Sequence, residues 1–233
     1  MIEANLGKKL IIEVEGKKWA RFPIKTPVIK KGDDLVKIIQ QETDLYLRKG
    51  DIIFISEKIV AISQGRAFPI SEIKPSWLAN FLVKFVYKSP YGIGLGSPWT
   101  MQLAIQEVGS LRILFAALLA AFTKPLGIRG VFYLVTGRRV AAIDGPCAYT
   151  LPPYNQYAKL GPAKPRQTAE FLKYKLGCEV VIIDANDLGV NILGKSSKKI
   201  SSSWAAAIFR DNPLGQSSEQ TPVCLVREIT SRV

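Results

Sequence analysis

The 233-residue sequence contains no histidine. Imidazole is therefore excluded as a general base, as the partner of a nucleophilic Ser or Cys, and as a zinc ligand. The three cysteines, Cys147, Cys178 and Cys224, are far apart and form no C-x-x-C pair, so neither a disulfide framework nor a four-thiolate metal site is expected. Any chemistry has to use carboxylates, amides, hydroxyls, Lys, Arg or a hard metal ion.

Long apolar runs are also absent. The most apolar stretch, 111–122, is interrupted by Arg112 and falls short of the roughly 20 residues that a membrane span needs. Its apolar residues recur at three- and four-residue spacing, which predicts a buried helix. The polar face of this helix has little Lys or Arg, so no membrane partner is expected. The N-terminus has an acid where a signal peptide would be basic, and we expect a cytoplasmic protein.

Basic residues are in excess, with 32 Lys and Arg against 19 Asp and Glu, a net charge of +13. Clusters such as Lys30-Lys31 and Arg138-Arg139 would attract anionic ligands, including nucleic acid. No recognition helix or aromatic-basic motif accompanies them, which makes nucleic acid an unlikely partner. The otherwise ordinary composition predicts one globular domain over residues 1–233, with a subdomain near 145–205 as an option.

Short β-branched runs alternate with helical patterns. Gly177 follows a helical window at 168–176 that Thr168 would cap, and acids at Asp33-Asp34 precede the apolar positions of another helix. Proline- and glycine-rich stretches predict loops at 89–98 and 151–166. The predicted strands are 9–14, 51–55, 130–135, 140–143, 179–183 and 222–226. The pattern is that of an α+β protein.

Two aspartates follow apolar runs directly: Asp144 after VAAI and Asp184 after VVII. A carboxylate at the carboxyl end of a buried strand faces the crevice where sheets bind ligands, and two of them would hold Mg or Mn on oxygen. Asp187 could contribute to the same site. The alternative is that Asp144 and Asp187 are ordinary turn residues, since each precedes a glycine closely.

The segment 212–222 is a glycine-bearing loop before the last predicted strand. Its backbone N–H groups could bind phosphate, although neither it nor the rest of the chain has the G-x-x-x-x-G-K-[ST] pattern. The glycines of 91–96 follow no clear strand, so we interpret that run as a flexible loop rather than a dinucleotide site.

Five segments in order resemble the coenzyme F-420-0 gamma-glutamyl ligase family. They are TPVIKKGDDL at 26–35, GDIIFISEKIVAISQGR at 50–66, AIDGPC at 142–147 with LPP at 151–153, IIDAN at 182–186, and LGQSSEQTPVCLVRE at 214–228. The resemblance implies the α+β fold of that family, with mixed, largely antiparallel sheets and packed helices. It also implies a homodimer.

The activity implied by the resemblance is a GTP-dependent ligation. L-glutamate would be joined through its amine to a carboxylate of a deazaflavin-type, F-420-0-like acceptor, by way of an acyl phosphate. Mg or Mn would be the cofactor, with K as a further cation. Metal ions that neutralise phosphate charge suit such chemistry, and no histidine is needed for it.

The resemblance also implies the site residues, although it assigns no catalytic one. The metal ligands would be Asp144, Asp184 and Gln216. The nucleotide contacts would be Thr26, Pro27, Val28, Ile29, Glu57, Lys58, Gly215, Gln216, Ser217, Ser218 and Glu219.

Four positions depart from the family pattern. Ile62 replaces a lysine, Cys147 an asparagine, Ala185 a threonine and Gln220 a glycine. All four fall on the implied nucleotide and metal site. They leave open a member of the same fold that binds a nucleotide or polyanion without turnover, or that acts on another substrate. A basic nucleic-acid-binding protein is the second alternative.

Overall fold

In the computed structural model, residues 2–86, 94–128, 130–186, 189–215 and 218–229 are described. The chain divides into two compact units: unit 1 comprises residues 1–64 and 163–233, and unit 2 comprises residues 65–162. Unit 2 is thus inserted into unit 1. The subdomain expected near 145–205 straddles the second boundary between the units.

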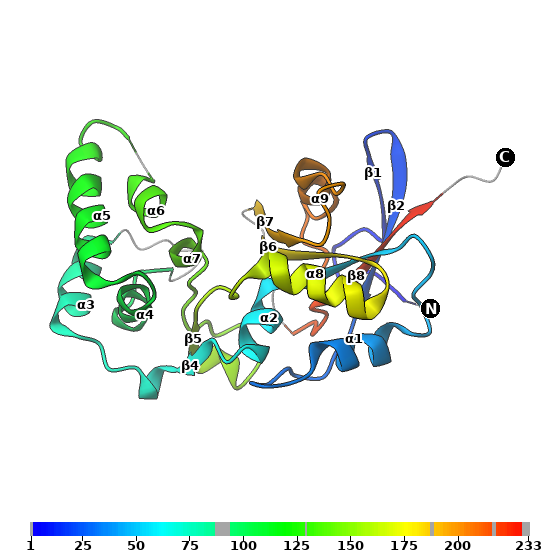
Figure 1. Cartoon of the computed structure of the whole chain (residues 1–233), viewed down its shortest axis with the longest axis horizontal. Coiled ribbons are helices and arrows are strands. Elements are labelled where there is room, and N and C mark those ends of the chain that lie inside the picture. The colour runs from blue at the N-terminus through cyan, green and yellow to red at the C-terminus, as the bar shows by residue number, and fades with distance from the viewer. Residues whose placement is uncertain (1, 87–93, 129, 187–188, 216–217, 230–233) are drawn as a thin grey trace. The chain divides into compact units, whose positions relative to one another are not determined.

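Unit 1 is built on a six-stranded sheet of order β1-β2-β8-β3-β6-β7 (Figure 1). All its strand pairs are antiparallel except β3 with β6. The strands are β1 Ile11–Val14, β2 Lys17–Ile24, β3 Ile52–Ser56, β6 Glu179–Asn186, β7 Gly189–Lys195 and β8 Val223–Ile229. The α+β class and the largely antiparallel sheet are confirmed.

Helices cover the faces of this sheet. Phe54, Val181 and Ile183 pack with α9 on one face, and the alternate residues Ile53 and Ile182 are buried toward the other, because successive strand residues point to opposite faces. Near-continuous apolar strands follow from this double burial. The helices of unit 1 are α1 Leu35–Thr43, α2 Glu57–Ser63, α8 Pro165–Leu176 and α9 Ser202–Ile208.

The helix ends of unit 1 follow capping rules in part. Asp34 caps α1 by accepting from the N–H groups of Val36 and Lys37, as the acids there predict. Gly177 ends α8 in the left-handed conformation, as expected. Thr168 is not the N-cap of α8, however, because the helix begins at Pro165, and Pro is favoured in the first turn.

Unit 2 is mainly helical and has its own core, which includes Met101, Ile113 and Val140. A two-stranded sheet joins β4 Ala67–Pro69 to β5 Tyr157–Lys159. The helices are α3 Trp77–Leu82, α4 Pro98–Val108, α5 Ser110–Thr123, α6 Val131–Thr136 and α7 Arg138–Ala141, with short 3₁₀ turns η1 Ile70–Glu72, η2 Val83–Phe85 and η3 Tyr154–Gln156.

Two strand predictions in unit 2 are wrong. The β-branched and aromatic run at 130–135 forms α6, and 140–143 lies at the end of α7. Gly130 and Gly137, both with positive φ, bound a six-residue helix that packs on α5, so tertiary packing overrides strand propensity here. The isolated bridge of Asp144 with Lys159 is all that remains of the second strand.

The apolar stretch 111–122 is helical, as predicted, but only partly buried. Ile113 and Ala116 face the unit 2 core, while Leu111 and Phe122 are exposed. The helix breaks at Gly109, where α4 and α5 meet at a bend of 115°. Over the described part of the chain, no single helix has the length and apolarity of a membrane span, although the bent pair meets the criterion jointly.

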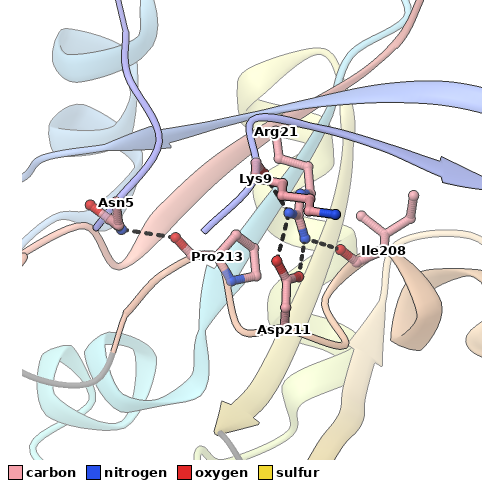
Figure 2. Close-up of polar contacts among 6 residues, drawn as sticks. All are labelled: Asn5, Lys9, Arg21, Ile208, Asp211 and Pro213. Carbon is pink, nitrogen blue, oxygen red and sulfur yellow. Dashed lines mark hydrogen bonds and ion pairs between the residues drawn. The ribbon is translucent and has the colours of Figure 1, made fainter. Parts of the chain in front are cut away.

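A buried arginine joins three segments of unit 1 by hydrogen bonds. Arg21 of β2 is fully buried, and its guanidinium donates to the Ile208 carbonyl (2.8 Å), to the Lys9 carbonyl and to both carboxylate oxygens of Asp211 (Figure 2). These bonds join the segment before β1, the end of α9 and the start of the loop before β8 to one side chain. The position of that loop therefore depends on an ion pair.

Loss of the ion pair between Arg21 and Asp211 should contribute to the fall in stability at acid pH. Partial burial opposes ionisation of Asp211, but the hydrogen bonds and charge of Arg21 outweigh it and hold the pKa of that carboxyl below its ordinary value. The contribution is complete above the unfolded pKa of about 3.9 and is lost as pH falls through the lower folded pKa. Urea midpoints measured from about pH 5 down to about pH 3 should therefore drop less for Asp211→Asn than for the unaltered protein. Parallel pH profiles would contradict this.

A second ion pair joins the two central strands on the other face of the sheet, since Arg227 directly follows Val226, the residue that pairs with Arg21. Arg227 of β8 donates through Nε and Nη2 to both carboxylate oxygens of Asp51, each at 2.7 Å, and through Nη2 to the Tyr46 carbonyl at 2.7 Å. The Asp51 carboxylate is fully buried and also accepts from the Arg48 N–H (2.9 Å). This pair fixes the start of β3 against the end of β8.

Candidate functional site

Four implied site segments meet at one edge of the unit 1 sheet. Because β3 and β6 are parallel and Ser56 pairs with Ile183, the residues that follow this pair lie at the same edge: Glu57 begins α2, and Asp184 lies near the end of β6. β8 is antiparallel to both of its neighbours, and its first residue, Val223, pairs with Ile55 and Ile24. The end of β2 and the loop before β8 therefore reach this edge too.

Hydrogen bonds hold these segments together. The Thr26 N–H donates to the Gln220 carbonyl (3.2 Å), and Gln220 Nε2 donates back to the Thr26 carbonyl (2.6 Å). The Ser56 N–H donates to the Pro222 carbonyl (2.8 Å). The segment after β2, the end of β3 and the loop before β8 are thus joined directly, as a shared binding site would require.

Side-chain hydrogen bonds hold the loop before β8 in place. Asn5 Nδ2 donates to the Pro213 carbonyl at 2.8 Å (Figure 2). It also donates to Thr221 Oγ1 (2.8 Å), and Thr221 Oγ1 donates to the Leu214 carbonyl (2.8 Å). Asn212 is fully buried and donates to the Gly215 carbonyl (3.1 Å). Sequence reasoning missed Asn5 and Asn212, because a single amide carries no motif.

Glu57 and Lys58 begin α2 just beyond β3. Ser56 caps the helix by accepting from the Lys58 N–H (3.3 Å), and Glu57 is buried in the first turn, where the helix dipole favours a negative charge. Lys58 is half-buried. A carboxylate and a cation therefore stand side by side in sequence at the edge of the sheet.

The two implied metal aspartates belong to different units. Asp184 lies half-buried in β6, paired across to Asn191 of β7. Asp144 lies in unit 2, where its backbone bridges Lys159 and its Oδ1 accepts from the Gly145 N–H (3.0 Å). Within the described ranges no group of three or more Asp, Glu or Cys side chains is assembled as a metal cluster. Gln216, Ser217 and Asp187 lie outside the described residues.

The remaining implied nucleotide residues vary in exposure. Ile29 and Thr26 are buried, Val28, Gly215 and Glu219 are half-buried, and Pro27 and Ser218 are exposed. Gly215 has φ +76, and a Cβ there would lie 2.4 Å from Glu219 Cδ. Only glycine fits this approach of the Glu219 side chain to the loop backbone. The exposed groups are those available to a ligand.

The four residues that depart from the family pattern differ in their burial and in the element to which they belong. Ile62 is buried in α2, so no charged group from this position reaches the edge. Ala185 is half-buried in β6, and Cys147 is a free, half-buried thiol in unit 2. All three cysteines are free, which confirms that there is no disulfide framework. Gln220 keeps a glycine-like backbone, with φ +56.

The backbone at Gln220 leads to a measurable ordering of variants. Both Gln220→Ala and Gln220→Gly lose the side-chain hydrogen bond to Thr26, but only alanine retains the left-handed strain, which costs a non-glycine residue about 1–2 kcal/mol. We expect Gln220→Gly to exceed Gln220→Ala by about 1 kcal/mol in the free energy of urea unfolding. Equal stability, or a more stable alanine variant, would contradict the assigned conformation.

A charge network near Asp144 was not anticipated from the residues. In unit 2, Arg66 Nε donates to the Gly161 carbonyl (2.6 Å), and its Nη2 donates to Glu107 (2.9 Å), which also faces Arg139 at 3.8 Å. Arg66 is the last residue of the second segment of the resemblance, 50–66. That place in the motif is the sequence signal that could have identified it. It fixes the strand that carries Lys159.

Comparison with known proteins adds two findings. The profile of the family described as F420-0:Gamma-glutamyl ligase matches residues 23–191. An uncharacterized protein of Methanocaldococcus jannaschii is 27% identical over 175 residues, which are 71% of this chain and 56% of that protein. The chain therefore spans about half the length of the curated relative that it matches.

Proposed function

The chain belongs to the F420-0:gamma-glutamyl ligase family, and from this premise we propose that it is a GTP- and divalent-metal-dependent ligase. It would join L-glutamate by an amide bond to a carboxylate of a coenzyme F-420-0-like, deazaflavin-type acceptor. We place the enzyme in the cytoplasm as a homodimer, with K as an additional cation.

The observation that carries the proposal is the meeting of four segments at one sheet edge. The segment Thr26–Ile29, the pair Glu57-Lys58, Asp184 and the loop that ends at Pro222 come from distant parts of the sequence. Ligands of mixed sheets bind at the carboxyl ends of parallel strands, which here are the ends of β3 and β6. We assign the nucleotide to this edge, with Gly215, Gln216, Ser217, Ser218 and Glu219 on its phosphate side.

The donor set at this edge suits a hard divalent ion. Mg²⁺ prefers oxygen ligands and is usually held by one or two carboxylates together with substrate phosphates and waters. Asp184 provides one such carboxylate at this edge, and the family resemblance implies Asp144 and Gln216 as further ligands. A bound Mg²⁺ or Mn²⁺ would neutralise charge on the transferring phosphoryl group.

The reaction would proceed in two balanced steps. A carboxylate oxygen of the acceptor attacks the γ-phosphorus of GTP, the bond to the β-phosphate oxygen breaks, and GDP leaves. The amine of glutamate then attacks the acyl carbon, inorganic phosphate leaves with the electron pair, and the amine nitrogen loses a proton to form the amide. The protein would hold the nucleotide and the acceptor in line for this attack. The ammonium group of Lys58 would offset the negative charge of the phosphates.

Titration of the purified protein with GTP, with and without Mn²⁺, tests the site. We expect metal-dependent binding that the double variant Asp144→Asn/Asp184→Asn abolishes. Metal-independent binding, or binding that the double variant leaves intact, would overturn the metal assignment. Glutamate-dependent GDP release with a deazaflavin acceptor tests the ligase reaction itself.

A non-catalytic, nucleotide- or polyanion-binding member of the family is the second candidate. It is favoured by Ile62, which is buried where the family pattern has a lysine and so removes one cation from the edge. Tight GTP binding without GDP release across several acceptors would establish this candidate in place of the ligase.

A further inference from the structure

Helix α5 of unit 2 is apolar on the side that its own unit leaves open. Ile113 and Ala116 are buried in the unit 2 core, whereas the opposite side is exposed. Positions four, seven and eleven residues apart lie along one side of a helix. The open side consists of Leu111 (83% exposed), Phe115 (55%), Leu118 (56%) and Phe122 (68%).

The apolar surface continues past the helix. Leu126 and Ile128 of the turn after α5 are exposed, and so is Leu134 of α6, which packs beside α5 (Figure 1). Arg112 Nε donates to the Val135 carbonyl (2.8 Å) and holds α6 to α5. We call this surface, from Leu111 to Leu134, the α5–α6 face. A helix that is apolar on all sides needs an apolar partner for the side that does not face its own core.

In the chain segment that carries the α5–α6 face, every charged residue is basic. The sequence from Val108 to Ile143 contains five basic residues and no Asp or Glu; they are Arg112, Lys124, Arg129, Arg138 and Arg139. Arg112 and Lys124 are exposed, and Arg139 faces Glu107 at 3.8 Å. An apolar surface that carries exposed cations at both ends of its helix complements a bilayer that contains anionic lipid.

A second copy of the chain is a poorer occupant. A two-fold dimer places each patch on its own equivalent, so cations would face cations with no acid from the same segment to pair with them. Helix α5 has 14 residues, about 21 Å at 1.5 Å per residue, which is shorter than the roughly 30 Å hydrocarbon core. The helix would therefore lie in the bilayer interface.

We propose that the α5–α6 face docks unit 2 onto the surface of an anionic lipid bilayer. The apolar side of α5 enters the boundary between headgroups and acyl chains, and Arg112 and Lys124 contact lipid phosphates. This proposal revises the expectation of no membrane partner, which rested on the polar face of the helix alone. It is independent of the proposed ligase activity.

Vesicle flotation of the full chain tests the proposal. The protein should float with phosphatidylcholine vesicles that contain phosphatidylglycerol and much less with phosphatidylcholine alone. The double variant Phe115→Gln/Leu118→Gln, which keeps the net charge, should lower the partition coefficient at least about tenfold, because two large apolar side chains lose their transfer from water. The matched control is Leu6→Gln/Leu45→Gln, two residues of unit 1 that are 98% and 89% exposed; it should change partitioning less than about twofold.

Each other outcome would overturn the proposal. Equal loss in both double variants would mean that exposed apolar residues bind lipid wherever they lie on the chain. Loss in neither would mean that the charge of +13 alone adsorbs the protein. A dimer seen by light scattering that Phe115→Gln/Leu118→Gln dissociates, without vesicle binding, would assign the face to a second copy. Hydrogen exchange of the unaltered protein covers the case in which the variant fails to fold: vesicles should protect residues 110–136, and protection elsewhere would refute the docking face.

Discussion

Asp184→Asn is expected to lower glutamate-dependent GDP release by about 10²–10³-fold, the usual effect of removing one group that stabilises transition-state charge. Asp184 lies in β6 one residue beyond Ile183, which pairs with Ser56, the N-cap of α2. Its charge is the only change, since Asn has nearly the same shape. GDP release with a deazaflavin acceptor, measured at saturating GTP and Mn²⁺, gives the effect on turnover.

A matched control separates a site effect from loss of one negative charge. Glu13→Gln changes an exposed carboxyl on β1, at the far end of the strand order from β6, and should leave turnover within about twofold. If Asp184→Asn retained most of the activity, Asp184 would have no part in phosphoryl transfer. If both variants lost activity equally, the effect would belong to overall charge.

Arg227→Met is expected to lower the free energy of unfolding by about 3–5 kcal/mol, the cost of leaving a buried charge without its partner. Arg227 satisfies both oxygens of the fully buried Asp51 carboxylate. Methionine conserves much of the apolar stem but supplies no donor. Urea unfolding at neutral pH measures the loss.

The same protein offers an exposed pair as the control. Lys17 and Glu228 lie 2.8 Å apart with side chains 58% and 35% exposed, and such pairs contribute about 0–1 kcal/mol. Lys17→Met should therefore be nearly neutral, and Arg227→Lys should fall between the two because a single ammonium cannot make the paired contact. Similar losses for Arg227→Met and Lys17→Met would show that burial of Asp51 is not what makes its pair strong.

The sequence predicts β1, β3, β6 and β8 of the unit 1 sheet but misses β2 and β7. β3, β6 and β8 are buried on both faces, so they appear as unbroken apolar runs. β2 was not predicted, because KKWARFPI contains three basic residues and a proline. Its Arg21 is buried only because Asp211, 190 residues later, is there to pair with it. A local pattern carries no sign of such a partner.

Apart from Asp144 and Asp184, which also follow apolar runs, the candidate site residues were identified by resemblance. The position of Asp184 at a strand end follows from its apolar run, but the meeting of Thr26 with Gln220 depends on β2 and β8 being neighbours. Asp144 was expected after a strand and follows α7 instead. Its place in unit 2 was not predictable, because the division of the chain is a property of the folded contacts.

The insertion of unit 2 has a consequence for the order of folding. Gln64 and Ala163, the residues of unit 1 on either side of the insertion, are joined by two hydrogen bonds, Gln64 Nε2 to the Ala163 carbonyl (3.1 Å) and the Ala163 N–H to Gln64 Oε1 (2.7 Å). During synthesis from the N-terminus, unit 2 is complete before β6 and β8 leave the ribosome, and domains fold as units as they emerge. Among the described strands, β3 pairs with these two later ones alone, so the edge proposed to bind the nucleotide is assembled last, after the helical unit has been completed.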